Sequence, residues 1–137
     1  MRLLLDTHAF LWFVAGDFTL SAHARSLIED EGNDKLVSIV SLWEIAVKTS
    51  LGKLPLAKPF EQFIPEQLTR NGFQVLALTV AHTAKVAALP LHHRDPFDRM
   101  LVAQSLVENL PLFVAFTYRQ NNICLISTRK ATPRARR

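Results

Sequence analysis

The chain has 137 residues, of which 49% are hydrophobic and 20% are charged, and these values predict one globular domain with a sizeable core. Its 4 glycines and 7 prolines argue against a low-complexity or disordered chain. The single cysteine, Cys124, excludes an internal disulfide framework and a multi-cysteine zinc site, and inside the apolar run Ile123–Ile126 we expect it to be a buried, unreactive thiol.

The positive charge is concentrated at the carboxyl end. Five lysines or arginines and no acid occupy the last nine positions, whereas the formal net charge of the whole chain is +4. Residues 1–128 therefore carry a net charge of −1, and the sequence pI of about 9.6 reflects a tail instead of a basic face. We expect a domain over residues 1–128 and a disordered basic tail over residues 129–137, with at most a weak, salt-sensitive attraction to nucleic acid.

The amino-terminal apolar stretch does not resemble a targeting segment. Asp6 and His8 interrupt Leu3–Ala15, and no small-residue cleavage site follows. No run reaches the roughly 18 apolar residues that a membrane span requires. We therefore expect a soluble, cytoplasmic protein that does not bind a membrane.

The first half of the chain alternates short apolar runs with longer helical ones. In order, it predicts the strand Leu3–Leu5, the helices His8–Val14 and Ser21–Asp30, the strand Lys35–Val40 and the helix Ser41–Leu51. Ser21 is the expected N-cap of its helix. Ser41 and Glu44 have the spacing of a capping box, and Gly52 is expected to end that helix.

The second half continues the same alternation. It predicts the helix Pro59–Arg70, the strand Phe73–Leu78, the helix Thr79–Leu89, a helix from Asp95 to Asn109, and the strands Leu112–Phe116 and Ile123–Ser127. Pro65 is expected to kink or divide its helix, because proline cannot donate a backbone hydrogen bond. Asp95 followed by Pro96 is typical of an N-cap and a first helical residue.

Continuous apolar strands separated by helices indicate a parallel sheet that is covered on both faces. Right-handed crossovers then give a doubly wound α/β sandwich of about five strands. In such folds, ligands bind at the carboxyl edge of the sheet. Candidate functional residues are therefore sought at that edge.

Four acidic residues are predicted to lie at the carboxyl edge. Asp6 directly follows the first strand, and Glu44, Asp95 and Asp98 fall in the first turns of helices that begin at this edge. Each of the last three also has a local explanation, as a capping-box residue, an N-cap and a first-turn acid respectively. Asp6 is harder to explain locally, because a carboxylate at a buried strand end needs a cation or hydrogen-bond donors to stay ionised. The topology places the acids in one layer without bringing them to one point.

Several carboxylates without a glycine-rich phosphate loop favour hard divalent cations such as Mg²⁺ or Mn²⁺. Acids that hold such ions can activate water and stabilise the charge of an in-line phosphodiester displacement. The residues thus predict metal-assisted phosphoryl chemistry, and they do not by themselves choose RNA over DNA.

The histidines do not form an alternative metal or nucleophile site in the sequence. His8 and His82 lie on predicted helices without a partner at metal-ligand spacing, and His92 and His93 fall in a polar loop.

Two tryptophans and two arginines complete the candidate residues. Trp12 and Trp43 lie among apolar neighbours, so we expect core or interface packing in preference to base stacking. Arg94 and Arg99 flank the acids, where they could neutralise the cluster or contact phosphates.

Three segments together resemble one protein family. They are LLLDTHAFLW (Leu3–Trp12), SIVSLWEIAVKTSLGKL (Ser38–Leu54) and HHRDPFDRMLVAQS (His92–Ser105). In order and spacing they are similar to the VapC-type toxins of the PIN-domain family, and the likeness runs from about Leu3 to Leu112.

The resemblance implies a three-layer α/β/α sandwich with a central five-stranded parallel sheet of order 3-2-1-4-5. It also implies a Mg²⁺- or Mn²⁺-dependent endoribonuclease, the toxin of a type II toxin–antitoxin pair. Matched by position, Asp6, Glu44 and Asp98 correspond to the catalytic, metal-binding acids of the family. Thr7 and Asp95 are then candidates to support those ligands.

The same resemblance implies partners. These are a homodimer, an RNA substrate, and a cognate VapB-type antitoxin that wraps the toxin and can place a basic side chain near the acids. Binding to operator DNA is expected only through the antitoxin.

The resemblance fails in one place. Where the family has an aspartate after the fourth strand, this chain reads Leu112-Phe113-Val114-Ala115-Phe116-Thr117, so that Phe116 occupies the position of the acid. An apolar ring cannot ligate Mg²⁺, and the loss of one carboxylate weakens a second metal more than the first. We therefore expect ribonuclease activity that is reduced by the loss of this fourth carboxylate.

Other classes of function stay open at this point. The chain could be a degenerate PIN domain that acts mainly as an antitoxin-binding module, with Phe116 as its signature. A nucleotide-binding α/β domain is disfavoured because neither a GxGxxG motif nor a P-loop occurs. A phosphoacceptor receiver domain would need a phosphorylatable aspartate at a middle strand and a downstream lysine, and neither is evident.

Overall fold

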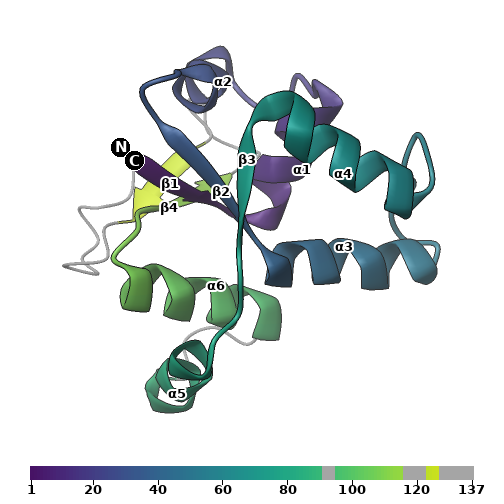
Figure 1. Cartoon of the computed structure of the whole chain (residues 1–137). Helices are drawn as coiled ribbons and strands as arrows, with labels where there is room; N and C mark the ends of the chain where they lie inside the picture. The colour runs from purple at the N-terminus through teal and green to yellow at the C-terminus, as the bar shows by residue number, and fades with distance from the viewer. Residues whose placement is uncertain (91–94, 116–122, 127–137) are drawn as a thin grey trace.

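The computed structural model describes residues 1–90 and 95–115 together with the backbone of residues 123–126 (Figure 1). The strands are β1 (Arg2–Leu5), β2 (Asp34–Ser38), β3 (Phe73–Leu76), β4 (Leu112–Ala115) and β5 (Ile123–Ile126). The helices are α1 (Thr7–Ala15), α2 (Ala22–Glu29), α3 (Ile39–Ser50), α4 (Phe60–Asn71), α5 (Val80–Ala88) and α6 (Pro96–Glu108). Within this part of the chain, no helix combines the length and the apolar character that a membrane span requires.

The strands form one sheet in the order β3-β2-β1-β4-β5. The first four are parallel, and Leu5 of β1 lies between Val37 of β2 and Phe113 of β4. The last strand runs antiparallel to β4, so the prediction of a wholly parallel five-stranded sheet is wrong at β5. The reason is the short connection: β4 ends at residue 115 and β5 begins at residue 123, whereas a parallel crossover needs a dozen or more residues.

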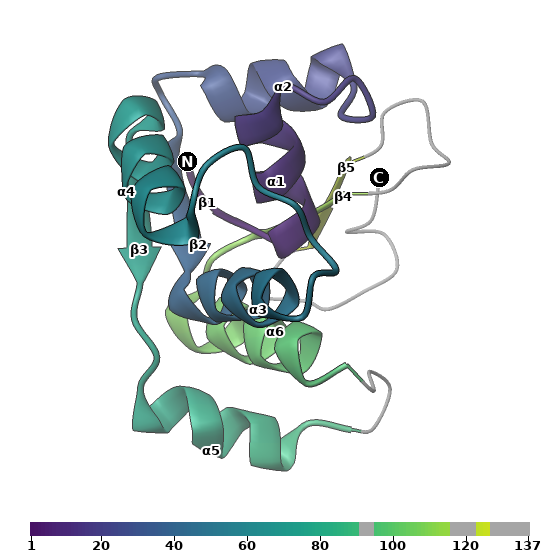
Figure 2. The same ribbon diagram turned by 90° about the vertical axis from the view of Figure 1, so that its right-hand side faces the viewer.

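Apolar side chains on both faces of the sheet explain its two layers of helices. On one face, Leu3 and Leu5 pack with residues of α1, α2 and α4, including Phe10. On the other face, Leu4 packs with Leu101 of α6. Figure 2 shows α1, α2 and α4 on one side of the sheet and α6 on the other, with α5 outside α6. The α/β/α layering expected from the sequence is therefore present.

The start of α3 differs from the prediction. Ser38 at the end of β2 is the N-cap, and its hydroxyl oxygen accepts a hydrogen bond from the Val40 N–H at 2.9 Å. The predicted capping box of Ser41 and Glu44 is therefore wrong, because both residues lie inside the helix and are buried there. The earlier cap ends β2 two residues sooner than expected and moves Glu44 out of the first turn.

Other local signals agree better with the structure. Ser21 caps α2 and Asp95 caps α6, as predicted. Pro65 does not divide α4, which is continuous from Phe60 to Asn71. At this position the helix loses only the single hydrogen bond that an N–H at residue 65 would donate.

A buried polar network joins β2, α5 and α6. His82 of α5 is fully buried; its Nδ1 accepts from the Thr79 N–H at 3.0 Å, and its Nε2 lies 2.7 Å from Glu108 Oε2. Gln104 of α6 accepts from the Ser38 hydroxyl at 2.5 Å, and its amide nitrogen donates to the Ala77 carbonyl at 3.3 Å. These contacts give the buried histidine a structural role.

We predict that His82→Leu destabilises the fold by roughly 1–3 kcal/mol, because it removes the hydrogen bonds that the fully buried ring makes with the Thr79 N–H and with Glu108. Urea unfolding of the two proteins measures the difference. Glu108→Gln is the matched control and should cost less, because Gln can still accept from the ring. Equal unfolding midpoints for His82→Leu and the wild type would contradict this role.

Candidate active site

Asp6 is held at the carboxyl edge of the sheet by backbone groups. Its own N–H donates to the Phe113 carbonyl of β4 at 2.8 Å, and its carboxylate caps α1 by accepting from the Ala9 N–H at 2.8 Å. The backbone of Ala115 also donates to this carboxylate. The carboxylate is therefore fixed between β1 and β4, where the sequence predicted it.

The surroundings of Asp6 disfavour its negative charge. Burial raises the pKa of its carboxyl from the usual 3.8 to about 7, against the opposing effect of the hydrogen bonds from Ala9 and Ala115. The charges of Asp98 and Glu44 raise the pKa of Asp6 further. Glu44 of α3 and Asp98 of α6 thus lie close enough to Asp6 for their charges to act on it.

Glu44 occupies the second turn of α3 and is only 4% exposed. Its Oε1 accepts from the Thr7 hydroxyl at 2.7 Å, and that hydroxyl lies 3.0 Å from the Ser41 Oγ. Its Oε2 accepts from Lys48 Nζ at 2.7 Å. Thr7 therefore orients a carboxylate, while a lysine supplies the positive charge that the buried carboxylate needs.

Lys48 is a site residue that the sequence analysis missed. The hydrogen bond to Glu44 is the main reason that the pKa of Lys48 is raised, and the charges of Asp95 and Asp98 add to it. The available signal was the spacing of Glu44 and Lys48, since residues four apart face each other on a helix. The charge of Lys48 is thus stabilised by Glu44 and by the two acids at the start of α6.

The acids of α6 have defined local surroundings. Asp95 accepts from the Phe97 N–H at 2.8 Å and the Asp98 N–H at 3.3 Å, as its predicted N-cap role requires. Asp98 lies in the first turn, and both acids are exposed.

Arg99 donates hydrogen bonds to carbonyls at the end of α5 and just after it. These are the carbonyls of Pro90 at 2.9 Å, Val86 at 3.0 Å and Leu89 at 3.5 Å. The guanidinium therefore joins α6 to the end of α5. Arg94 and Phe116, as well as His92, His93 and the basic tail, fall outside the described residues.

The acids do not form a closed metal site in the part of the chain that the structure describes. There, no three His, Cys, Asp or Glu side chains lie close enough together to hold one metal ion. A cation shared by Asp6, Glu44 and Asp98 therefore stays a prediction, while Lys48 is the positive group in direct contact with Glu44.

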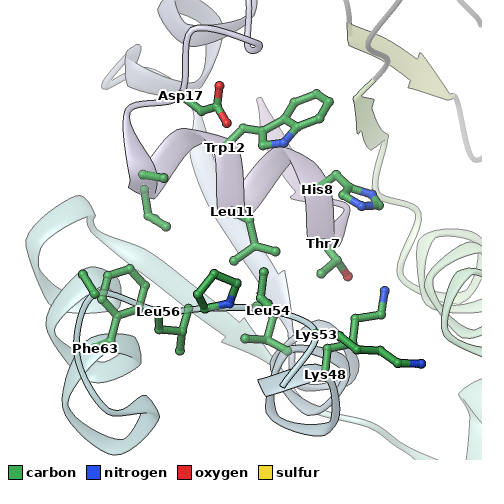
Figure 3. Close-up of a pocket in the computed structure, with 15 residues that line it drawn as sticks. Thr7, His8, Leu11, Trp12, Asp17, Lys48, Lys53, Leu54, Leu56 and Phe63 are labelled. Carbon is green, nitrogen blue, oxygen red and sulfur yellow. The ribbon is translucent and has the colours of Figure 1, made fainter. Parts of the chain in front are cut away.

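A cavity of about 590 Å³ adjoins Glu44. Thr7 and Lys48, which both contact Glu44, line one end of it, and Lys53 and His8 lie at that same end (Figure 3). The rest of the wall is largely apolar and comes from α1, the segment 54–57 and α4. Lys48 thus stands between the buried acid and an open space that solutes can enter.

The two tryptophans lie in different surroundings. Trp12 is partly buried at the cavity wall, as a packing role predicts. Trp43 is 61% exposed and contacts the ring of Phe97 edge-on at 5.0 Å. Trp43 is therefore not a core residue of the single chain.

We predict that Asp6→Asn stabilises the protein at pH 8 in the presence of a chelator. Between pH 4 and 7 the folded protein holds a proton on Asp6 that the unfolded chain releases, so the free energy of unfolding falls as the pH rises through this window. Asn keeps the N-cap and removes the charge. The variant should exceed the wild type by roughly 2–4 kcal/mol at pH 8, and the difference should shrink towards pH 4. Urea unfolding at both pH values measures this; a difference that does not depend on pH would contradict it.

Comparisons with known proteins agree with the fold. The family model described as PIN domain matches residues 3–124. Ribonuclease VapC16 of Mycobacterium tuberculosis is 40% identical over 60 residues, which cover 44% of this chain and 43% of that protein. The crystal structure of VapBC2 from Rickettsia felis, bound to a promoter DNA fragment, matches with a TM-score of 0.60 and 14% identity, over 82% of this chain and 86% of that one. The last likeness supports the fold alone. The chain belongs to the PIN-domain family.

Proposed function

We propose that the chain is the ribonuclease toxin of a type II toxin–antitoxin pair, and that it hydrolyses RNA with Mg²⁺ or Mn²⁺ bound at Asp6, Asp98 and Glu44. The observation that carries this proposal is the position of Asp6: its carboxylate is fixed at a buried strand end by the Ala9 N–H, close enough to Asp98 and Glu44 for their charges to act on it. The relative named ribonuclease VapC16 supports the same function.

The donor chemistry of these residues fits a hard divalent cation. Mg²⁺ and Mn²⁺ prefer carboxylate oxygens and keep several waters, so a cluster of acids is a suitable environment. Two features favour such a site: the acids come from rigid elements, and the carboxylate of Asp6 is already fixed by backbone donors. A metal bound at Glu44 would also meet the positive charge of Lys48.

The protein's own residues perform the positioning. Asp6 and Asp98 would hold the cation, and Thr7 would keep Glu44 oriented towards it. When bound, the cation supplies a polarised phosphodiester and an activated water. Lys53 at the end of the cavity lies where the negative charge of an RNA backbone would need a partner.

We predict that the protein cleaves RNA in Mn²⁺ and that Asp6→Asn lowers the rate at least about a hundredfold, because it removes a charged metal ligand. Phe116→Asp should raise the rate by restoring the acid that the family has at this position. Cleavage of a labelled RNA measures both effects. Asp34→Asn is the control; Asp34 is an exposed acid at the start of β2, on the opposite edge of the sheet.

The second candidate function is a degenerate PIN domain that mainly binds an antitoxin. The lysine on Glu44 and the lack of a closed three-acid site among the described residues favour it. The same assay separates the two: equal behaviour of the wild type and Asp6→Asn, together with activity of Phe116→Asp and a stoichiometric antitoxin complex, would identify a binding module. In either case, we propose that operator DNA is bound through a VapB-type antitoxin.

We also propose that the chain is a homodimer. An apolar surface formed by Ile39, Trp43 and Leu78 is exposed, with exposed fractions of 42%, 61% and 45%. Trp43 and Leu78 line one shallow hollow between α3, α5 and α6. A second copy of the chain would cover these side chains.

Trp43→Glu should therefore produce a monomer, because it places a charge in the centre of this surface. Light scattering during gel filtration measures the mass. Phe18→Glu is the matched control, because Phe18 is a fully exposed aromatic residue outside this surface. A dimer that persists in Trp43→Glu would place the interface elsewhere.

A further inference from the structure

Lys48 and Glu44 form an ion pair whose two partners are unequally buried. The pair has the common spacing of residues four apart on a helix, and its N–O distance is 2.7 Å. When both partners are exposed, such pairs contribute only a few tenths of a kcal/mol. Here the side chain of Glu44 is 5% exposed and that of Lys48 is 41% exposed. One partner is therefore buried and fixed, while the other reaches it from solvent.

The fixed partner needs a positive charge. Glu44 receives one hydrogen bond from Thr7, and the ammonium of Lys48 is the cation that the structure places on its other oxygen. Leaving a buried carboxylate unpaired is costly. The charge of Glu44 also acts on Asp6, so neutralising Glu44 lowers the repulsion within the whole group of acids.

The exposed partner, Lys48, can move away from Glu44. The ammonium of Lys48 ends a flexible chain of four carbons, and the residue also lines the open cavity beside α1. A divalent cation that approaches the acids meets Lys48 on the oxygen it would bind. A metal bound at this carboxylate and the ammonium of Lys48 would repel each other, because both are positive and lie close together.

On the basis of the proposed function, we propose that Lys48 is an internal counter-ion of the metal site. It holds Glu44 in place while no metal is present, its charge opposes a divalent cation that binds the same carboxylate, and it thereby sets the cation affinity of the acids. Lys48 is in this sense a positioning residue, because it acts through Glu44.

Mn²⁺ binding by the full chain tests this inference directly. Lys48→Met keeps most of the length of the side chain and removes the charge that opposes the metal. The Kd for Mn²⁺, measured by calorimetry, should fall by roughly tenfold or more, because the unpaired Glu44 then attracts the metal. Lys48→Arg keeps the charge and should stay within about threefold of the wild type. Lys53→Met is the matched control; it removes a charge from the same cavity without touching Glu44 and should leave the Kd nearly unchanged.

A second variant tests the route through Glu44. In the double variant Lys48→Met/Glu44→Gln, the gain in affinity should disappear, and the stability lost in Lys48→Met should return because no buried charge is left unpaired. This pair of measurements remains informative even when the single variant is less stable.

The outcomes distinguish this inference from the proposed function. If the wild type binds Mn²⁺, Asp6→Asn abolishes that binding and Lys48→Met leaves the Kd unchanged or weaker, the inference about Lys48 is wrong while the metal site stands. If Lys48→Met weakens only RNA binding, Lys48 is a substrate contact and the inference is again wrong. If neither the wild type nor any variant with Asp6 intact binds Mn²⁺, both the inference and the proposed metal-dependent function are wrong.

Discussion

The central physical constraint in this molecule is the placement of negative charge at a buried strand end. A parallel strand that is covered on both faces ends in a region where a carboxylate loses its water. Asp6 stands at such an end, and two backbone donors reduce the penalty without removing it, so the pKa of its carboxyl stays near 7. The surrounding elements hold that group in place, and they add two more acids beside it.

The contacts around Glu44 show how the fold stabilises a second buried carboxylate. Thr7 follows Asp6 directly in the chain, and its hydroxyl reaches Glu44 on α3. One short segment thus supplies both an acid and the group that orients a second acid. Lys48, one helical turn beyond Glu44, supplies the opposite charge from the same helix. The protein can therefore hold its acids in place without a metal.

The parts of the site that depend on local sequence could be predicted. Asp6 and Asp95 were expected at a strand end and at a helix cap, and both lie there, because these positions depend on neighbouring residues only. The bond from Thr7 to Glu44 could not be predicted, since it joins residues 37 positions apart through the packing of α1 on α3. The cap of α3 was misassigned because two serines compete for it, and only Ser38 has a hydroxyl at the end of β2. The direction of β5 was readable from its short connection and was missed.

The hydroxyl of Ser38 has a consequence for the spacing of the acids. It caps α3, which carries Glu44, and it also donates to Gln104 on α6, which carries Asp98. All three polar groups are buried, so dissolved ions cannot screen the bonds between them. Ionic strength should weaken the half-exposed bond of Lys48 while it leaves the separation of the two helices unchanged. The salt concentration around the protein thus affects the ion pair of the site, whereas the buried bonds of Ser38 keep the spacing of its helices constant.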